Sequence, residues 1–125
     1  MRTAMGLIMI SNATLFLFGA IQHIGFSVGR FHEPKIVPAF IVETICGLFL
    51  LWGSIAVFGH FPRTRKIALI SNLVALGGVL LGMAALAAGR GPRTASNDLY
   101  HRIMLLLIGA SLLILFFGRS ALEGD

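Results

Sequence analysis

Residues 38–53 read PAFIVETICGLFLLWG, an apolar run that contains a single charged residue, Glu43. Extended to 37–58, the run is long enough to cross a lipid bilayer, which takes about 20 residues. A carboxylate inside such a segment is costly, so we expect Glu43 to have either a polar partner on another helix or a function.

The composition of the whole chain matches this segment. Of 125 residues, 57% are apolar and only 12% are charged, whereas soluble domains carry about 25% charged residues. The pattern predicts an all-α fold, an integral membrane four-helix transmembrane bundle with short loops, in which residues 1–125 form one domain. The predicted spans are 4–28, 37–58, 67–88 and 103–118.

The basic residues concentrate between the spans, where lipid phosphates account for the formal net charge of +5. We therefore expect the bilayer, and not nucleic acid, as a partner. Four spans place both termini on one side of the membrane. The two sides carry equal numbers of Lys and Arg: Arg2, Arg63, Arg65, Lys66 and Arg119 against Arg30, Lys35, Arg90, Arg93 and Arg102. The dense cluster at 63–66 favours cytoplasmic termini.

Several polar residues are expected to meet at one end of the bundle. If the first two spans form an antiparallel hairpin, His23 and Glu43 lie at similar depth, because each is about ten residues from the turn and both helices rise 1.5 Å per residue. Gly19 and His23 share one face of the first span. The fourth span begins on the same side. The expected cluster comprises Gln22, His23, Glu43, Tyr100, His101 and Arg102.

This cluster has two interpretations. It is either a polar clasp that holds the helices together, or the lining of a pocket for a polar head group, a quinone or a proton. His23 and His101 could also act as axial haem ligands, but no second histidine pair supports that. A metal site built from His23, Glu43 and His101 lacks recognisable ligand spacing. We therefore predict no metal and no cofactor, and keep quinone and haem as the alternatives.

Small residues occur where membrane helices would pack closely. Gly78 and Gly82 follow the G-x-x-x-G pattern, and Gly47 and Gly53 lie in the second span. Small side chains let helix backbones approach in lipid, so these four glycines are expected to mediate helix packing. Cys46 is the only cysteine, which excludes a disulfide within the chain.

The pattern Glu43-x-x-x-Gly47-Leu48-x-x-x-x-Gly53, followed by a basic turn and Ile67-Ala68-Leu69, resembles the core signature of the DoxX and DoxX-like families. This chain has Cys46-Gly47 where the family usually has two glycines. The resemblance implies a four-helix membrane protein, and some family members are membrane subunits of quinone-reducing oxidoreductases. Glu43, Gly47 and Gly53 are the matching positions.

The expected function is that of a small membrane subunit or accessory protein that packs into a larger membrane complex without catalytic chemistry of its own. One alternative is a DoxX-like, quinone-linked redox subunit that binds quinone near His23 and Glu43. A further alternative is a lipid-binding or small-solute transport protein. Expected partners are other membrane subunits or further copies of the chain, in a prokaryotic inner membrane. No catalytic motif is recognised, so an enzyme is not the favoured interpretation.

Overall fold

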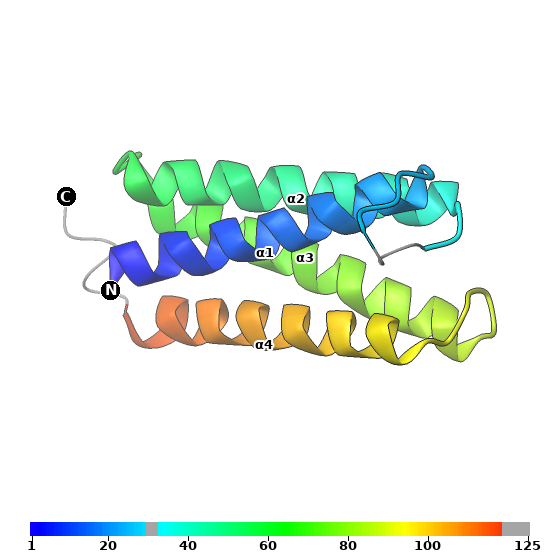
Figure 1. The fold of residues 1–125 in the computed structure, drawn as a ribbon. Helices are drawn as coiled ribbons and strands as arrows, with labels where there is room; N and C mark the ends of the chain where they lie inside the picture. The colour runs from blue at the N-terminus through cyan, green and yellow to red at the C-terminus, as the bar shows by residue number, and fades with distance from the viewer. Residues whose placement is uncertain (30–32, 119–125) are drawn as a thin grey trace.

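The computed structural model describes residues 1–29 and 33–118, and its helices form an all-α bundle. The four helices are α1 (Arg2–His23), α2 (Val37–Phe58), α3 (Thr64–Ala87) and α4 (Ala95–Phe117). Figure 1 shows them running along one common axis, with the turns between α1 and α2 and between α3 and α4 at the same end. The predicted fold class is therefore confirmed. Arg30 and Arg119, which entered the charge comparison, lie outside the described residues.

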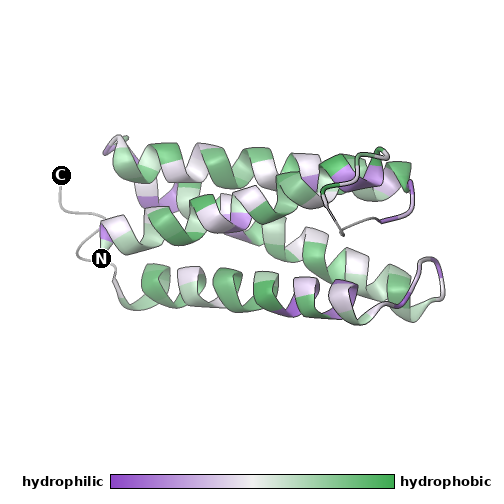
Figure 2. Ribbon diagram, viewed as in Figure 1, coloured by the Kyte–Doolittle hydropathy of each residue, from purple (hydrophilic) through white to green (hydrophobic). Residues whose placement is uncertain are grey.

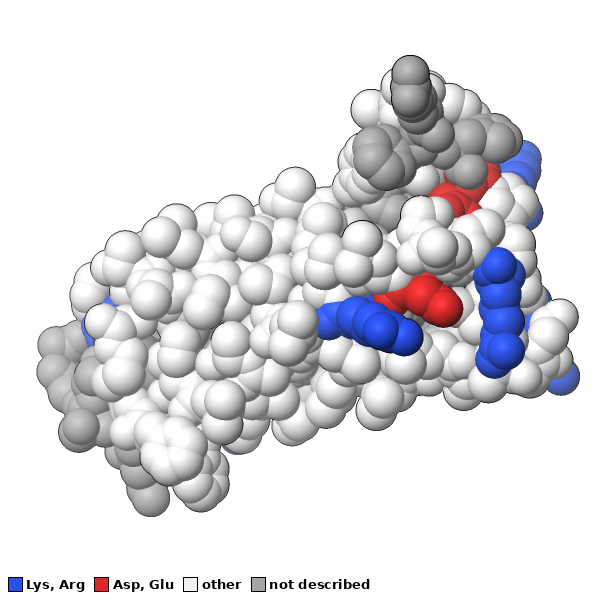
Figure 3. All heavy atoms as spheres, turned by 60° about the horizontal axis from the view of Figure 1, so that its bottom comes forward, with Lys and Arg blue, Asp and Glu red and all other residues white. Residues whose placement is uncertain are grey.

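All four helices are long and apolar enough to cross a membrane. They contain 22 to 24 residues and so span roughly 33–36 Å at 1.5 Å per residue. Hydrophobic residues dominate the helices in Figure 2. In Figure 3 a broad uncharged zone occupies the middle of the visible face, and most of the acidic and basic side chains in view lie toward one end. These features indicate an integral membrane protein.

The helix ends differ most from the predicted spans at the end of α1 and the start of α4. α1 ends at His23 and not at residue 28, because the chain turns at Gly25, whose φ is +101°, a conformation that favours glycine. α4 begins at Ala95, well before the predicted start at 103. Its N-cap is Thr94, whose Oγ1 accepts a hydrogen bond from the Asn97 backbone N–H at 3.1 Å. Tyr100 consequently lies inside a helix.

Two hydroxyl groups tie α2 to its neighbours. Ser54 donates to the Gly6 carbonyl of α1 at 3.1 Å, and the Thr64 hydroxyl of α3 lies 3.0 Å from the Ala56 carbonyl oxygen of α2 and 2.5 Å from that of Phe61. Contact is most extensive between α1 and α2, follows between α2 and α3, and is sparser around α4. The position of α4 therefore depends on fewer contacts than those of the other helices.

Glycines lie where the helices approach most closely. A Cβ atom at Gly47 would lie 2.7 Å from Leu17 Cγ, and one at Gly53 would lie 2.9 Å from Ser71 Cβ. A Cβ at Gly78 would overlap Cys46 Sγ. The buried core beside these approaches consists mainly of aliphatic and methionine side chains: Met5, Met9, Phe16, Leu50, Val57, Val79, Met104 and Ile108.

The neighbouring glycines of α3 provide a matched test of this packing. Gly78→Ala should lower the free energy of unfolding by about 1–3 kcal/mol, because the new methyl group has no room beside Cys46. Gly77→Ala should leave it unchanged or raise it by up to about 1 kcal/mol, since nothing lies within 4 Å of the added Cβ and alanine favours helix. Unfolding in SDS-containing mixed micelles measures both. Equal effects of the two substitutions would contradict the packing described.

Candidate functional site

A cavity of about 340 Å³ lies between the helices, near the end of the bundle that carries the α1–α2 and α3–α4 turns. Every helix contributes to its wall, and most of the lining is apolar. The polar and charged side chains on its wall are His23, Glu33, Glu43, Arg90, Asn97, Tyr100 and His101. The lining includes Phe16, His23, Val42, Glu43, Gly78, Val79, Gly82, Ala85, Tyr100, His101 and Met104.

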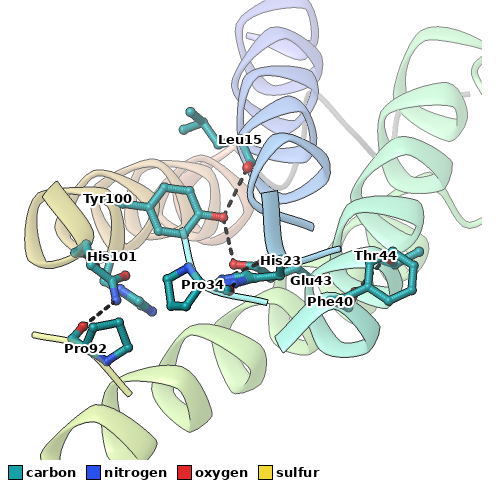
Figure 4. Close-up of polar contacts among 10 residues, drawn as sticks. Leu15, His23, Pro34, Phe40, Glu43, Thr44, Pro92, Tyr100 and His101 are labelled. Atoms are coloured by element: carbon teal, nitrogen blue, oxygen red, sulfur yellow. Dashed lines mark hydrogen bonds and ion pairs between the residues drawn. The ribbon is translucent and has the colours of Figure 1, made fainter. Parts of the chain in front are cut away.

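The Tyr100 hydroxyl is the point where three helices meet at this cavity. It lies 3.2 Å from Glu43 Oε1 on α2 and 3.1 Å from the Leu15 carbonyl oxygen on α1. Figure 4 shows the phenol of Tyr100 reaching between these two acceptors. Since one hydroxyl carries a single proton, it donates to one of the two acceptors at a time. Glu43 thus has the interhelical polar partner that a carboxylate in an apolar helix requires.

Gly19 makes this meeting possible. A Cβ atom at Gly19 would lie 2.5 Å from the Tyr100 hydroxyl oxygen and 2.8 Å from Glu43 Oε1. Any side chain there would separate the two groups. Gly19 precedes His23 by one helical turn on the same face of α1, so both residues border the cavity side of that helix.

His23 is held in place by the chain that follows α1. Its Nδ1 atom lies 3.1 Å from the Pro34 carbonyl oxygen, and the Ile36 N–H donates to the His23 carbonyl oxygen at 3.1 Å. A carbonyl oxygen only accepts, so Nδ1 carries the hydrogen. The other nitrogen, Nε2, lies 3.7 Å from Glu43 Oε2. Glu43 Oε2 is buried and makes no hydrogen bond within the described part of the chain.

His101 faces the cavity from α4. Its Nδ1 atom lies 2.8 Å from the Asn97 carbonyl oxygen, one turn earlier on the same helix, and therefore donates to it. A Cβ atom at Gly82 would lie 2.8 Å from His101 Nε2, so this glycine provides the space for the imidazole. The His101 ring also contacts the Tyr100 ring edge-to-face, with centroids 5.4 Å apart.

Four of the six residues expected in the cluster line the cavity: His23, Glu43, Tyr100 and His101. Gln22 is buried on α1 but is not part of the lining, and Arg102 is exposed on α4. Because α4 begins at Ala95, Arg102 lies within this helix, on its exposed face, and does not join the cluster. Within residues 1–29 and 33–118, no three His, Cys, Asp or Glu side chains are close enough to hold a metal ion.

Three contributors to the site were not predicted. Gly19 leaves space for the Tyr100–Glu43 contact, and the backbone carbonyls of Pro34 and Asn97 fix the two imidazoles. The spacing of Gly19 and His23, one helical turn apart in the sequence, could have indicated the role of Gly19. The two carbonyl contacts depend on turn and helix-start geometry that residue types do not reveal.

The interhelical hydrogen bond predicts the effect of a small change in α4. Tyr100→Phe removes only the hydroxyl and should lower the free energy of unfolding by about 0.5–1.5 kcal/mol. Thr14→Val is the matched control, because among the described residues the Thr14 hydroxyl bonds to the Ile10 carbonyl of its own helix alone, and should change stability by less than about 0.5 kcal/mol. Equilibrium unfolding in mixed micelles distinguishes the two. A neutral Tyr100→Phe would mean that the hydroxyl does not tie the helices together.

Comparison of the chain with protein-family models, with characterised proteins and with solved structures gives no match.

Proposed function

We propose that this protein is a small membrane subunit that binds the ring of a lipid-soluble quinone-class molecule in the cavity between its four helices. The observation that carries the proposal is the cavity itself, an apolar chamber with a few polar groups gathered on its wall. Small-molecule sites have this character, with volumes of about 300–1,000 Å³ and a small number of orienting polar groups.

The chemistry of the wall suits an amphiphilic ring. Phe16, Val42, Val79 and Met104 provide apolar contact surface, which favours a flat, lipid-soluble group. Glu43 and the imidazoles of His23 and His101 provide hydrogen-bonding atoms that can orient ring oxygens. A ligand that partitions into the bilayer also has direct access to a bundle whose helices lie in lipid.

The sequence pattern supports the same proposal. Glu43, Gly47 and Gly53 are the positions that resemble the DoxX and DoxX-like signature, and Glu43 lines the cavity. By that resemblance we propose that the protein acts within a larger membrane complex, either with other subunits or with further copies of itself. The basic cluster at 63–66 supports cytoplasmic termini in a prokaryotic inner membrane.

Purification in a mild detergent tests the proposal. Solvent extraction followed by mass spectrometry identifies bound small molecules, and a visible spectrum detects a chromophore. A co-purifying quinone would support the proposed function. A phospholipid in the cavity would favour the lipid-binding alternative, and a Soret band would favour haem. Stoichiometric partner subunits without any bound ligand would favour the purely structural accessory role.

Neighbouring alanines of α3 allow the cavity to be filled selectively. Ala85 lines the cavity, whereas Ala84 is exposed on the outer face of the same helix. Ala85→Phe should weaken binding of a short-chain ubiquinone analogue at least about tenfold, because the added ring occupies ligand space. Ala84→Phe should leave the dissociation constant within about twofold. Titration of the analogue against protein in nanodiscs measures both, and unchanged binding to Ala85→Phe would show that the ligand binds elsewhere.

A further inference from the structure

The cavity lies where α3 changes its neighbour in the bundle. At Gly78 α3 still packs on α2, because a Cβ atom there would lie 3.3 Å from Val42 Cγ1. One helical turn later it meets α4 instead, since a Cβ atom at Gly82 would lie 2.8 Å from His101 Nε2. Figure 1 shows the same crossing, with α3 beginning behind α2 and ending beside α4. α2 and α3 therefore diverge toward the end of the bundle that carries the cavity.

Between these diverging helices the cavity reaches the outer surface of the bundle. Its wall includes Pro38 and Ala39 of α2 and Leu81 and Ala85 of α3. Leu81 is 59% exposed and Pro38 is exposed as well, so both residues belong to the cavity wall and to the outer face. Leu81 precedes the end of α3 at Ala87 by six residues, or roughly 9 Å along the helix. The opening therefore lies within the membrane span and faces lipid.

The side of the cavity between α1 and α4 is bridged by polar contacts. The Tyr100 hydroxyl lies 3.1 Å from the Leu15 carbonyl oxygen of α1, and a Cβ atom at Gly19 would lie 2.5 Å from the same hydroxyl. Figure 4 shows the phenol of Tyr100 extending from α4 to α1. These two helices are thus in contact along this wall, and the opening to lipid lies on the α2–α3 side.

The cavity changes in polarity between the end of the bundle and this lateral opening. Glu33, Arg90 and Asn97 line it at the end of the bundle, beside the turns. The four residues at the lateral opening are all apolar. A bilayer has the same order of polarity, with head groups at its surface and acyl chains below. The arrangement suits a molecule that has a polar head group and an apolar chain.

The volume of the cavity limits which part of such a molecule it can hold. At about 340 Å³ it lies at the lower end of the range for small-molecule sites, about 300–1,000 Å³. It can accommodate a substituted ring, but not a long chain in addition. A chain that leaves through the lateral opening needs no enclosure by protein, because lipid acyl chains are as apolar as leucine side chains.

We infer that the ligand carries an apolar chain, which passes out of the cavity between α2 and α3 into the bilayer while the ring stays inside. This inference rests on the proposed function and adds the route of the chain. Leu81 and Ala39, on opposite sides of the opening, then contact the chain and not the ring. The ligand enters and leaves the site from lipid, without crossing the polar end of the bundle.

Neighbouring leucines of α3 provide a matched test. Leu81 lines the opening, whereas Leu80, 51% exposed, is not part of the cavity wall. The probes are a dimethoxy-methyl-benzoquinone without a chain and the same ring with two isoprene units. Leu81→Trp should weaken binding of the chain-bearing quinone at least about fivefold and that of the chainless one less than about twofold, because the indole occupies the path of the chain. Leu80→Trp should leave both dissociation constants unchanged.

The titrations are made in nanodiscs, with dissociation constants expressed per mole fraction in the lipid, so that stronger partitioning of the chain-bearing quinone does not imitate tighter binding. Equal effects of Leu81→Trp on the two quinones, or no effect on the chain-bearing one, overturn the inference and leave the proposed function standing. Failure of both quinones to bind the wild type overturns the proposed function itself.

Photolabelling of the wild-type protein locates the chain without any substitution. A quinone with a diazirine a few carbon atoms along its chain is bound in nanodiscs and irradiated, and the adducts are mapped by mass spectrometry. Adducts that an excess of unlabelled quinone suppresses should lie in residues 37–42 of α2 and 78–86 of α3. Suppressible adducts confined to α1 and α4 would overturn the inference, and this result decides it if Leu81→Trp does not fold.

Discussion

The Tyr100 hydroxyl lies within hydrogen-bonding distance of both Glu43 Oε1 and the Leu15 carbonyl oxygen, and so connects α4 to α2 and α1. α4 has the sparser packing in the bundle, so a polar contact there has a larger share in fixing its position. The contact also accounts for Glu43, because a carboxylate in an apolar helix is tolerated when another helix supplies a partner. The absence of a side chain at Gly19 is the steric condition for the whole arrangement.

The fold could be predicted from the sequence because the pattern of four long apolar segments is strong. Long apolar segments separated by basic and glycine-rich turns permit few folds other than a helical membrane bundle. The convergence of His23, Glu43, Tyr100 and His101 also followed, since antiparallel helices of equal rise place residues at equal distances from a turn at equal depth. Arg102 was expected in the cluster but lies on the exposed face of α4, a helix that begins after the Thr94 cap and so earlier than the predicted start.

The clasp and the pocket, which the sequence presents as alternatives, are combined in this structure. Tyr100 and Glu43 Oε1 join two helices, while His23 Nε2 lies 3.7 Å from Glu43 Oε2 and the His101 ring lines the same cavity. Backbone carbonyls of Pro34 and Asn97 determine which imidazole nitrogen carries the hydrogen. The hydrogen-bonding character of the cavity is therefore set by main-chain geometry, which explains why residue types alone did not reveal it.

A double-mutant cycle between Tyr100 and Glu43 measures most directly whether their contact holds the bundle together. The free energies of unfolding of Tyr100→Phe, Glu43→Leu and the double variant are compared with that of the wild type in mixed micelles. Two residues that interact directly should show a coupling energy of about 0.5–1.5 kcal/mol. Additive effects, with a coupling below about 0.3 kcal/mol, would contradict the central role given to this contact.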